Sequence, residues 1–595
     1  MPGKPAIRRM LAAALVLAPP AVLAVLVLKY SVNVPLWDQW EPDLAGIFEK
    51  YATGHLTFAD LLAQHNEARL FFPRLLFLGL GELTHWNVRF EMAATFIAAC
   101  LVALMVWRLE TPAYQGRPIV RLLALLLSSL LIFSPAYYEA WTWGLEVICF
   151  LPLACIAAGL LVARLPVSRE LRLLACAALA TVSTYSFGNG FLAWIVLFPA
   201  LFHRDSLPGF RRPRWAAGFW AAGFVANEAL YFFGYQNPVQ HRPLLELLWG
   251  CLEQPLRTAQ FFFAFLGSPL AGGTGSPQTA ATVIGLVLVA LFFGACLLIF
   301  RSRADRELVG GARPWLVIGG YALLSAGLAT SVRSAQFGVA EALSSRYGIF
   351  ALALVISVIH LAPLLPFPGR KRPDGGPQSR RLVQLGLALP AAGLLVLHAL
   401  AFPAGATAMR SLWQYRVLGK SCLAFVNVIP EQRNLTDLLC PNYDRLKQTA
   451  NSLEKLGLLI PPPFTAYPTN LFRHSLPPGE ESPGRLEGSR RIGNTDILLV
   501  GWAVSLSRKR EADGVLLTWE RAGGEPRLFG LVGDRLQRSD LEILMGKEPY
   551  YYAGWAKVCS LTNLPRESLV LKAWAYDVER QKAFPLDGVE AVDNR

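Results

Sequence analysis

The sequence predicts a polytopic α-helical membrane protein with about eleven transmembrane helices and a C-terminal β-sandwich outside the membrane. Of its 595 residues, 54% are hydrophobic and only 16% are charged, whereas about a quarter of a typical soluble protein is charged. The apolar residues gather in runs of roughly 17–23 residues, the length that crosses a hydrocarbon core about 30 Å thick. After residue 470 the apolar runs become short and rich in β-branched and aromatic residues, a pattern typical of strands.

The first apolar run, residues 10–28, follows Lys4, Arg8 and Arg9. Basic residues before an apolar run also mark a cleaved signal peptide. No small-residue cleavage site follows this run, and the run is long for a signal peptide. We therefore expect a retained first helix whose N-terminus is cytoplasmic.

The basic residues behind the net charge of +14 indicate which connections between the spans are cytoplasmic. Basic residues cluster in every second connection between apolar runs, as the positive-inside rule requires of cytoplasmic loops. This distribution argues against a nucleic-acid partner. The alternation predicts eleven spans, at residues 10–29, 90–107, 118–134, 147–163, 171–184, 190–203, 215–233, 281–300, 315–330, 348–366 and 384–402.

The expected domain organisation has three parts. Residues 1–402 form the membrane bundle, with exported loops at 30–89 and 235–280. Residues 403–470 form an exported helical connector, and residues 471–595 form an exported β-sandwich. Cys422 and Cys440 lie in the exported part, where a disulfide can persist; a bridge between them and two separate thiols are equally compatible with the sequence.

The segment directly after the first span reads WDQWEPD, residues 37–43. Tryptophans at this depth are ordinary interfacial anchors. In the alternative interpretation, Trp37 and Trp40 stack on the rings of a sugar substrate and Asp38 acts as a general base. Glu41 and Asp43 then complete the catalytic set, by binding acceptor hydroxyls or a divalent cation.

Other candidate substrate-binding residues share a position at the exported ends of spans. They are His65, Glu67, Arg69 and Arg74 in the first exported loop, and Glu139, Glu146, His241, Arg333, Arg346 and Tyr347 further along the chain. Asn189 and Glu341 are further polar residues at these ends. Guanidinium groups bind phosphate bidentately, so Arg74, Arg333 and Arg346 are candidate phosphate ligands. The structural alternatives are a loop salt bridge between Glu67 and Arg69, and an Arg346 that extends to lipid headgroups.

Several catalytic motifs are absent from the sequence. It contains no GxxxxGK[ST] or GxGxxG motif for nucleotides, no HExxH or CxxC pair for zinc, and no GxSxG motif for a serine nucleophile. The absence of these motifs is consistent with a group donor that already carries its leaving group, because such a donor needs no nucleotide-binding loop.

The order of these segments resembles the GT-C superfamily of polyprenyl-phosphate-sugar-dependent membrane glycosyltransferases. The resemblance is carried by WDQWEPD and, more loosely, by HNEARLFFPR and SRY, within a layout of one helix, a large acidic exported loop and many later spans. The C-terminal β-domain is similar to the carbohydrate-binding-like modules of bacterial arabinofuranosyltransferases.

This resemblance implies an inverting hexosyl- or pentosyltransferase in which Asp38 is the base. The implied donor is a polyprenyl-phosphate-linked sugar, and the acceptor is an envelope glycan, lipid or protein. Many members carry two adjacent acids, whereas Gln39 follows Asp38 here, so a Mg²⁺ or Mn²⁺ site would depend on Glu41 or Asp43. The implied location is a bacterial inner membrane, with the C-terminal domain periplasmic or extracellular.

Three other functions fit the same features. A transporter or flippase for lipid-linked glycans would carry ionisable residues within its spans and internal repeats; the spans contain few such residues, Glu228 being the main exception. An O-antigen polymerase or ligase would share the polar exported face. A non-catalytic assembly factor would use only the β-domain, to bind cell-wall polysaccharide.

Overall fold

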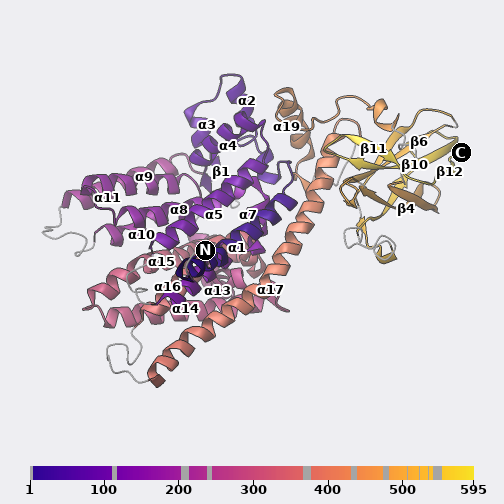
Figure 1. Ribbon diagram of the computed structural model, residues 1–595. Coiled ribbons are helices and arrows are strands. Elements are labelled where there is room, and N and C mark those ends of the chain that lie inside the picture. Colours follow the sequence, from indigo (N-terminus) through magenta and orange to yellow (C-terminus); the bar gives the residue numbers. More distant parts are fainter. Residues whose placement is uncertain are drawn as a thin grey trace. The chain divides into compact units, whose positions relative to one another are not determined.

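The computed structural model describes residues 4–109, 117–202, 214–236, 244–365, 377–429, 438–473, 482–540 except 506, 522 and 534, and 552–595 (Figure 1). The chain divides into two compact units, each described by itself. The membrane unit comprises Met1–Ser31, Leu56–Gly79 and Arg89–Arg410. The β unit comprises Val32–His55, Leu80–Val88 and Ser411–Arg595. The expected exported loop 30–89 is thus shared between the units.

Within the described residues, eight helical segments are long and apolar enough to cross a membrane, so the chain is a multi-pass membrane protein. The helices that form them are α1 (Lys4–Tyr30), α5 (Arg89–Leu109), α6 (Pro118–Ile132), α8 (Val147–Val162), α14 (Pro277–Arg301), α15 (Arg306–Phe337), α16 (Gly348–Leu361) and α17 (Pro377–Ala424). The other three expected spans coincide with α9 (Arg169–Thr184), α10 (Leu192–Leu201) and α11 (Arg214–Phe232), which do not meet that standard. The count of eleven stays a prediction.

The centre of the membrane unit is α16. The span Ser345–Leu364 contains α16, and 89% of its most apolar stretch is buried inside the protein. This burial arises because α16 packs against α15, α13 (Pro255–Ala271) and α14. Small residues let these helices approach closely, as is common in membrane bundles. A Cβ atom at Gly285 of α14 would lie 1.8 Å from the carbonyl oxygen of Phe263 in α13.

Short elements connect the spans at the end of the bundle where α15 ends and α8 begins, here called the site end. They are α3 (Phe58–Leu62), the hairpin β1 (Gln64–His65) and β2 (Ala68–Arg69), η3 (Pro135–Tyr137), α7 (Tyr138–Thr142), η4 (Gly144–Glu146), η6 (Val339–Leu343) and η7 (Ser345–Tyr347). The opposite end holds the connections from α8 to α9 and from α14 to α15, and we call it the arginine end.

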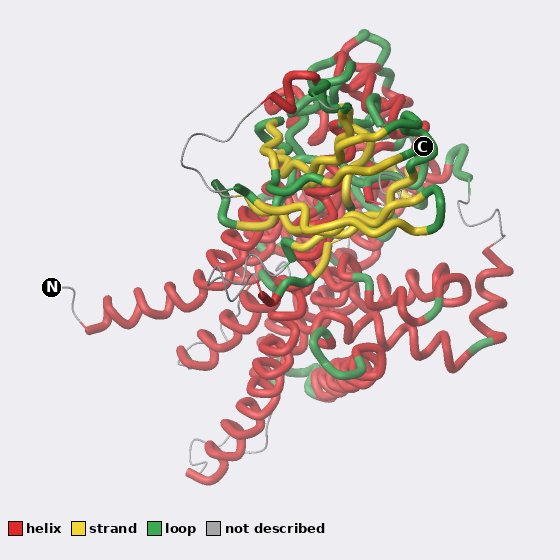
Figure 2. Tube along the Cα trace, turned by 90° about the vertical axis from the view of Figure 1, so that its right-hand side faces the viewer, coloured by secondary structure: helices red, strands yellow, loops and turns green. Residues whose placement is uncertain are grey.

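The C-terminal part of the β unit folds into two five-stranded antiparallel sheets (Figure 2). The first contains β6 (Gly514–Glu520), β7 (Arg527–Val532), β10 (Ser568–Asp577), β11 (Lys582–Pro585) and β12 (Glu590–Asp593). The second contains β3 (Gly484–Ile492), β4 (Asp496–Ser505), β5 (Arg510–Glu511), β8 (Arg535–Leu536) and β9 (Gly554–Ser560). Both sheets contribute to one apolar core, for example through Leu499, Leu517 and Trp555. The predicted change from helices to strands is therefore confirmed.

The rest of the β unit includes η1 (Trp37–Trp40), α2 (Gly46–Ala52) and α19 (Tyr443–Lys455). The amphipathic helix expected in the connector is confirmed, since Leu446, Ala450 and Leu453 of α19 are buried. Cys422 and Cys440 are buried and unpaired. The disulfide considered between them is not formed.

Candidate functional site

A network of acidic and basic side chains joins α15, the β1–β2 hairpin, η6 and η7 at the site end. Nη2 of Arg333, near the end of α15, lies 2.7 Å from Oε1 of Glu67 at the tip of the β1–β2 hairpin. Oε1 of Glu341 in η6 lies 3.8 Å from Nη1 of Arg333 and 3.6 Å from Nη2 of Arg346 in η7. The two arginines are therefore held near each other by a shared carboxylate.

Tyr347 forms a platform beneath both arginines. Its ring centroid lies 5.7 Å from the guanidinium carbon of Arg333 and 5.6 Å from that of Arg346, distances at which an aromatic face attracts a cation. The hydroxyl of Tyr347 donates to Glu341 over 3.3 Å, and its ring stacks on Phe265 of α13 with centroids 5.5 Å apart. This packing fixes the platform to the centre of the bundle.

Glu139 of α7 connects the network to the start of η7. Its Oε2 accepts a hydrogen bond from Ser345 Oγ at 2.7 Å and longer ones from Ser344 Oγ and the backbone N–H of Arg346, both at 3.4 Å. The Ser345 hydroxyl in turn accepts from the backbone N–H of Glu139 at 3.1 Å. These reciprocal bonds determine where η7 places Arg346.

Glu146 is the buried acid of this site, with a relative exposure of 2%. It accepts a hydrogen bond from the thiol of Cys149 at 3.0 Å. It is the last residue of η4, directly before α8.

Arg69 and Arg74 hold the hairpin that carries Glu67. Arg69 donates to the carbonyl oxygens of Tyr231 and Leu62, each at 2.6 Å. Arg74 is fully buried and donates to the carbonyl oxygens of Leu61 and Ala63 at 2.9 and 2.6 Å. These four hydrogen bonds all go to the backbone of neighbouring segments. His65 is buried in the same hairpin, where its Nε2 lies 3.4 Å from Nδ2 of Asn66.

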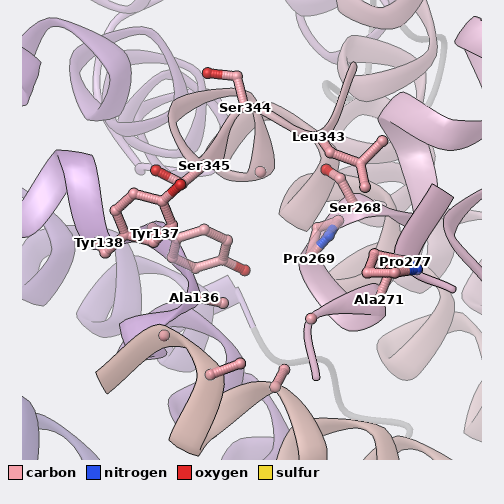
Figure 3. A pocket seen from close by; sticks show the side chains of 15 residues that line it. Ala136, Tyr137, Tyr138, Ser268, Pro269, Ala271, Pro277, Leu343, Ser344 and Ser345 are labelled. Carbon is pink, nitrogen blue, oxygen red and sulfur yellow. The ribbon is translucent and has the colours of Figure 1, made fainter. Parts of the chain in front are cut away.

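A cavity of about 180 Å³ adjoins this network. Its polar lining consists of hydroxyl groups from Tyr137, Tyr138, Ser268, Ser344 and Ser345, and none of its lining residues is charged. Tyr137 is 1% exposed, and its hydroxyl has no hydrogen-bond partner among the described residues. That hydroxyl points into the space that the lining residues enclose (Figure 3). Ser345 belongs both to this cavity and to the Glu139 network.

The WDQWEPD segment belongs to the β unit and is described with that unit alone. Trp37, at a backbone φ of 47°, is 47% exposed, whereas Trp40 is fully buried and donates from its indole N–H to the carbonyl oxygen of Pro35 at 2.9 Å. Asp38 and Asp43 are half-buried. Glu41 forms an ion pair with Arg445 of α19, and both of its carboxylate oxygens bond Nη1 of that arginine.

A divalent cation would need several oxygen ligands around one point. Glu41, one of the three acids considered for this role, is already paired with Arg445. Among the described residues no group of three His, Cys, Asp or Glu side chains is placed to hold a metal ion. His241, the remaining residue of the expected set, lies outside the described residues.

The structure adds residues to the site that the sequence analysis did not select. Ser344 and Ser345 bond Glu139, and Tyr137 faces the cavity. Glu341, a polar residue at the exported end of a span, joins the two arginines. The sequence signals for the other three residues were weak: two serines in SSRY and a tyrosine in an aromatic-rich stretch. None of these patterns identifies a site before the helix ends are brought together.

Comparison with known proteins yields no matching family model, no similar curated protein and no similar solved structure.

Proposed function

We propose that the protein is an inverting membrane glycosyltransferase that moves a sugar from a polyprenyl-phosphate donor to an envelope glycan, lipid or protein. The observation that carries the proposal is the pair Arg333 and Arg346, held over Tyr347 beside an uncharged, hydroxyl-lined cavity. A lipid-linked sugar phosphate has the matching parts, namely an anionic phosphate, an uncharged ring and an apolar chain.

The two arginines would bind the phosphate that leaves. Arg333, Arg346 and their neighbours Glu67 and Glu341 keep between 24% and 34% of their side-chain surface exposed, so a ligand can reach them. Guanidinium groups form bidentate, charge-assisted hydrogen bonds with phosphate oxygens. Positive charge fixed before the reaction stabilises the negative charge that develops on the leaving group.

The sugar would occupy the neighbouring cavity. Its volume of about 180 Å³ is below the roughly 300–1,000 Å³ of sites for drug-sized ligands, so a single small ring suits it. The Tyr137 hydroxyl, which lacks a described partner, would bond a sugar hydroxyl.

Asp38 would take the proton from the acceptor hydroxyl as that oxygen attacks the anomeric carbon and polyprenyl phosphate leaves. This role comes from the resemblance to GT-C enzymes, in which an acid of the first exported loop is the base, and Asp43 would assist in binding the acceptor. Glu41 would position the segment through its ion pair with Arg445. The proposal assigns no step to a metal ion.

The proposed location is a bacterial inner membrane with the N-terminus cytoplasmic and the site end exported. The eleven-span topology requires α9, α10 and α11 to cross as well, and the two C-terminal sheets would form a glycan-binding β-sandwich. The arginine-rich connections at the other end support this orientation through the positive-inside rule.

The proposal is tested by incubating the purified protein with radiolabelled polyprenyl-phosphate sugars and envelope acceptors in detergent. A transferase converts the label to acceptor product in detergent, where no closed compartment exists. If labelled glycan crosses proteoliposomes while no transfer occurs in either preparation, the protein is a transporter and the proposal fails.

A further inference from the structure

A second cavity, of about 230 Å³, lies at the arginine end of the membrane unit. It is lined by Arg164, which follows α8, by Arg172 of α9 and by Arg313 of α15, together with small and apolar residues that include Leu160 and Gly310. None of the described residues that line it is acidic.

Among the described residues, the hydrogen bonds of two of these arginines go to carbonyl groups, which do not neutralise the positive charge. Arg164 donates to the carbonyl oxygen of Leu109 at 3.1 Å. Arg172 reaches the carbonyl oxygen of Ala163 at 3.4 Å, and its buried Nε has no hydrogen-bond partner among the described residues. Carbonyl groups satisfy hydrogen bonds but carry no net charge, so guanidinium groups that face one space still repel each other.

The charges are close enough to affect one another. The surrounding protein atoms, and then the like charge of Arg313, lower the pKa of Arg164. Bringing an anion among these groups would replace repulsion with charge-assisted hydrogen bonds.

The cavity sits one membrane thickness from the network at the site end. Arg313 and Arg333 are both in α15, and twenty residues of α-helix span about 30 Å, the thickness of a hydrocarbon core. Arg164 follows α8 while Glu146 precedes it, so a second helix gives the same separation of ends. The arginine cavity is therefore at the depth of lipid headgroups on the opposite face of the bilayer.

We infer that this cavity is a binding site for a phosphate group, of the kind carried by an anionic phospholipid headgroup or by a free phosphate ion. Two or three guanidinium groups match the oxygens of one phosphate, and the apolar part of the lining suits the glycerol and first methylenes of a lipid. The inference concerns a site distinct from the proposed sugar-transfer site and stands without that function.

The experiment compares melting temperatures of the full chain in nanodiscs made of phosphatidylcholine alone and in nanodiscs that contain phosphatidylglycerol. A ligand that binds only the folded state raises the melting temperature, so the wild type should melt higher with phosphatidylglycerol. A third arm adds inorganic phosphate to phosphatidylcholine nanodiscs and identifies the source. A shift in this arm that equals the lipid shift assigns the site to free phosphate, and a shift with phosphatidylglycerol only assigns it to the headgroup.

Two variants examine the cavity by opposite routes. The double substitution Arg164→Gln/Arg172→Gln removes two ligands, and Arg301→Gln, at the exposed last residue of α14, is its matched control. Gly310→Asp supplies an internal carboxylate without removing any arginine, because a Cβ atom at Gly310 meets nothing within 4 Å. Gly310→Asn is the uncharged control for this change.

We expect the double variant and Gly310→Asp to lose most of the anion-dependent shift, while Arg301→Gln and Gly310→Asn keep it. Gly310→Asp should also melt higher than Gly310→Asn in phosphatidylcholine alone. The inference is overturned if the wild type shows no shift with either anion. It is equally overturned if Gly310→Asp retains the full shift, even where the double variant fails to fold.

Discussion

Nη2 of Arg333 lies 2.7 Å from Oε1 of Glu67, although the two residues are 266 positions apart in the chain. The pair joins the last turns of a membrane-crossing helix to the tip of a two-stranded hairpin. Both side chains remain partly exposed, and exposed ion pairs contribute at most about 1 kcal/mol to folding. The pair therefore contributes little to stability, and its role is to hold the guanidinium group of Arg333 at the membrane boundary.

The first prediction concerns Arg333 as a phosphate ligand. Arg333→Gln should lower kcat/KM for sugar transfer by about 100-fold, the usual cost of losing one group that stabilises developing negative charge. Its effect on the free energy of unfolding should stay below about 1 kcal/mol. Arg333→Lys should recover part of the activity because it restores the charge.

Steady-state kinetics and thermal unfolding of these variants check the first prediction. The control is Arg521→Gln, which removes a similar exposed ion pair, at 2.8 Å from Glu567, in the β unit. Arg333→Gln with normal kinetics would remove Arg333 from the proposed site.

The second prediction uses the unpartnered hydroxyl of Tyr137. Tyr137→Phe should leave stability unchanged or slightly increase it, because the substitution deletes a buried polar group that has no described hydrogen bond. If a sugar hydroxyl binds there, the same change should weaken donor binding by about tenfold, as expected for loss of about 1.4 kcal/mol.

Donor binding and thermal unfolding are measured on the same preparation. Tyr576→Phe is the matched control, since Tyr576 is also buried and its hydroxyl also lacks a described partner, but it lies in β10 of the β unit. Equal donor affinities for Tyr137→Phe and the wild type would exclude the cavity as the sugar site.

The third prediction tests whether Arg69 positions the hairpin or binds the substrate directly. Its bonds to the carbonyl oxygens of Tyr231 and Leu62 indicate that it positions the hairpin. Arg69→Lys keeps the charge but loses the planar fork, so we expect faster amide hydrogen exchange in residues 64–69 and little recovery relative to Arg69→Gln. A lysine that restores both exchange protection and donor affinity would instead indicate a direct role in binding the substrate.

The sequence predicts those features that depend on local periodicity. Pro277–Arg301 is continuously apolar and forms a spanning helix, and Ser568–Asp577 forms a strand whose buried Leu569, Leu571 and Ala573 alternate in position. The polar residues at the exported ends of spans were also recognisable, because a charge beside an apolar run stands out.

Other features depend on contacts between distant segments and had no local signal. The ion pair of Glu41 with Arg445 joins residues 404 positions apart. Trp37 and Trp40 are the same type of residue in the same short segment, yet only Trp37 is exposed. The arginines around the second cavity were interpreted only as a topology signal, because their convergence depends on how α8, α9 and α15 pack.

The most direct measurement is the rate of sugar transfer from a polyprenyl-phosphate donor by the wild type, by Asp38→Asn and by Glu49→Gln. Glu49 is an exposed acid in α2 that accepts from Ser452 at 2.8 Å, so it controls for the loss of one carboxylate near Asp38 in sequence. The account predicts transfer by the wild type and Glu49→Gln, and a loss of at least about 100-fold for folded Asp38→Asn, since general bases contribute about 10²–10⁴-fold. Folded Asp38→Asn that transfers sugar at the wild-type rate would contradict it.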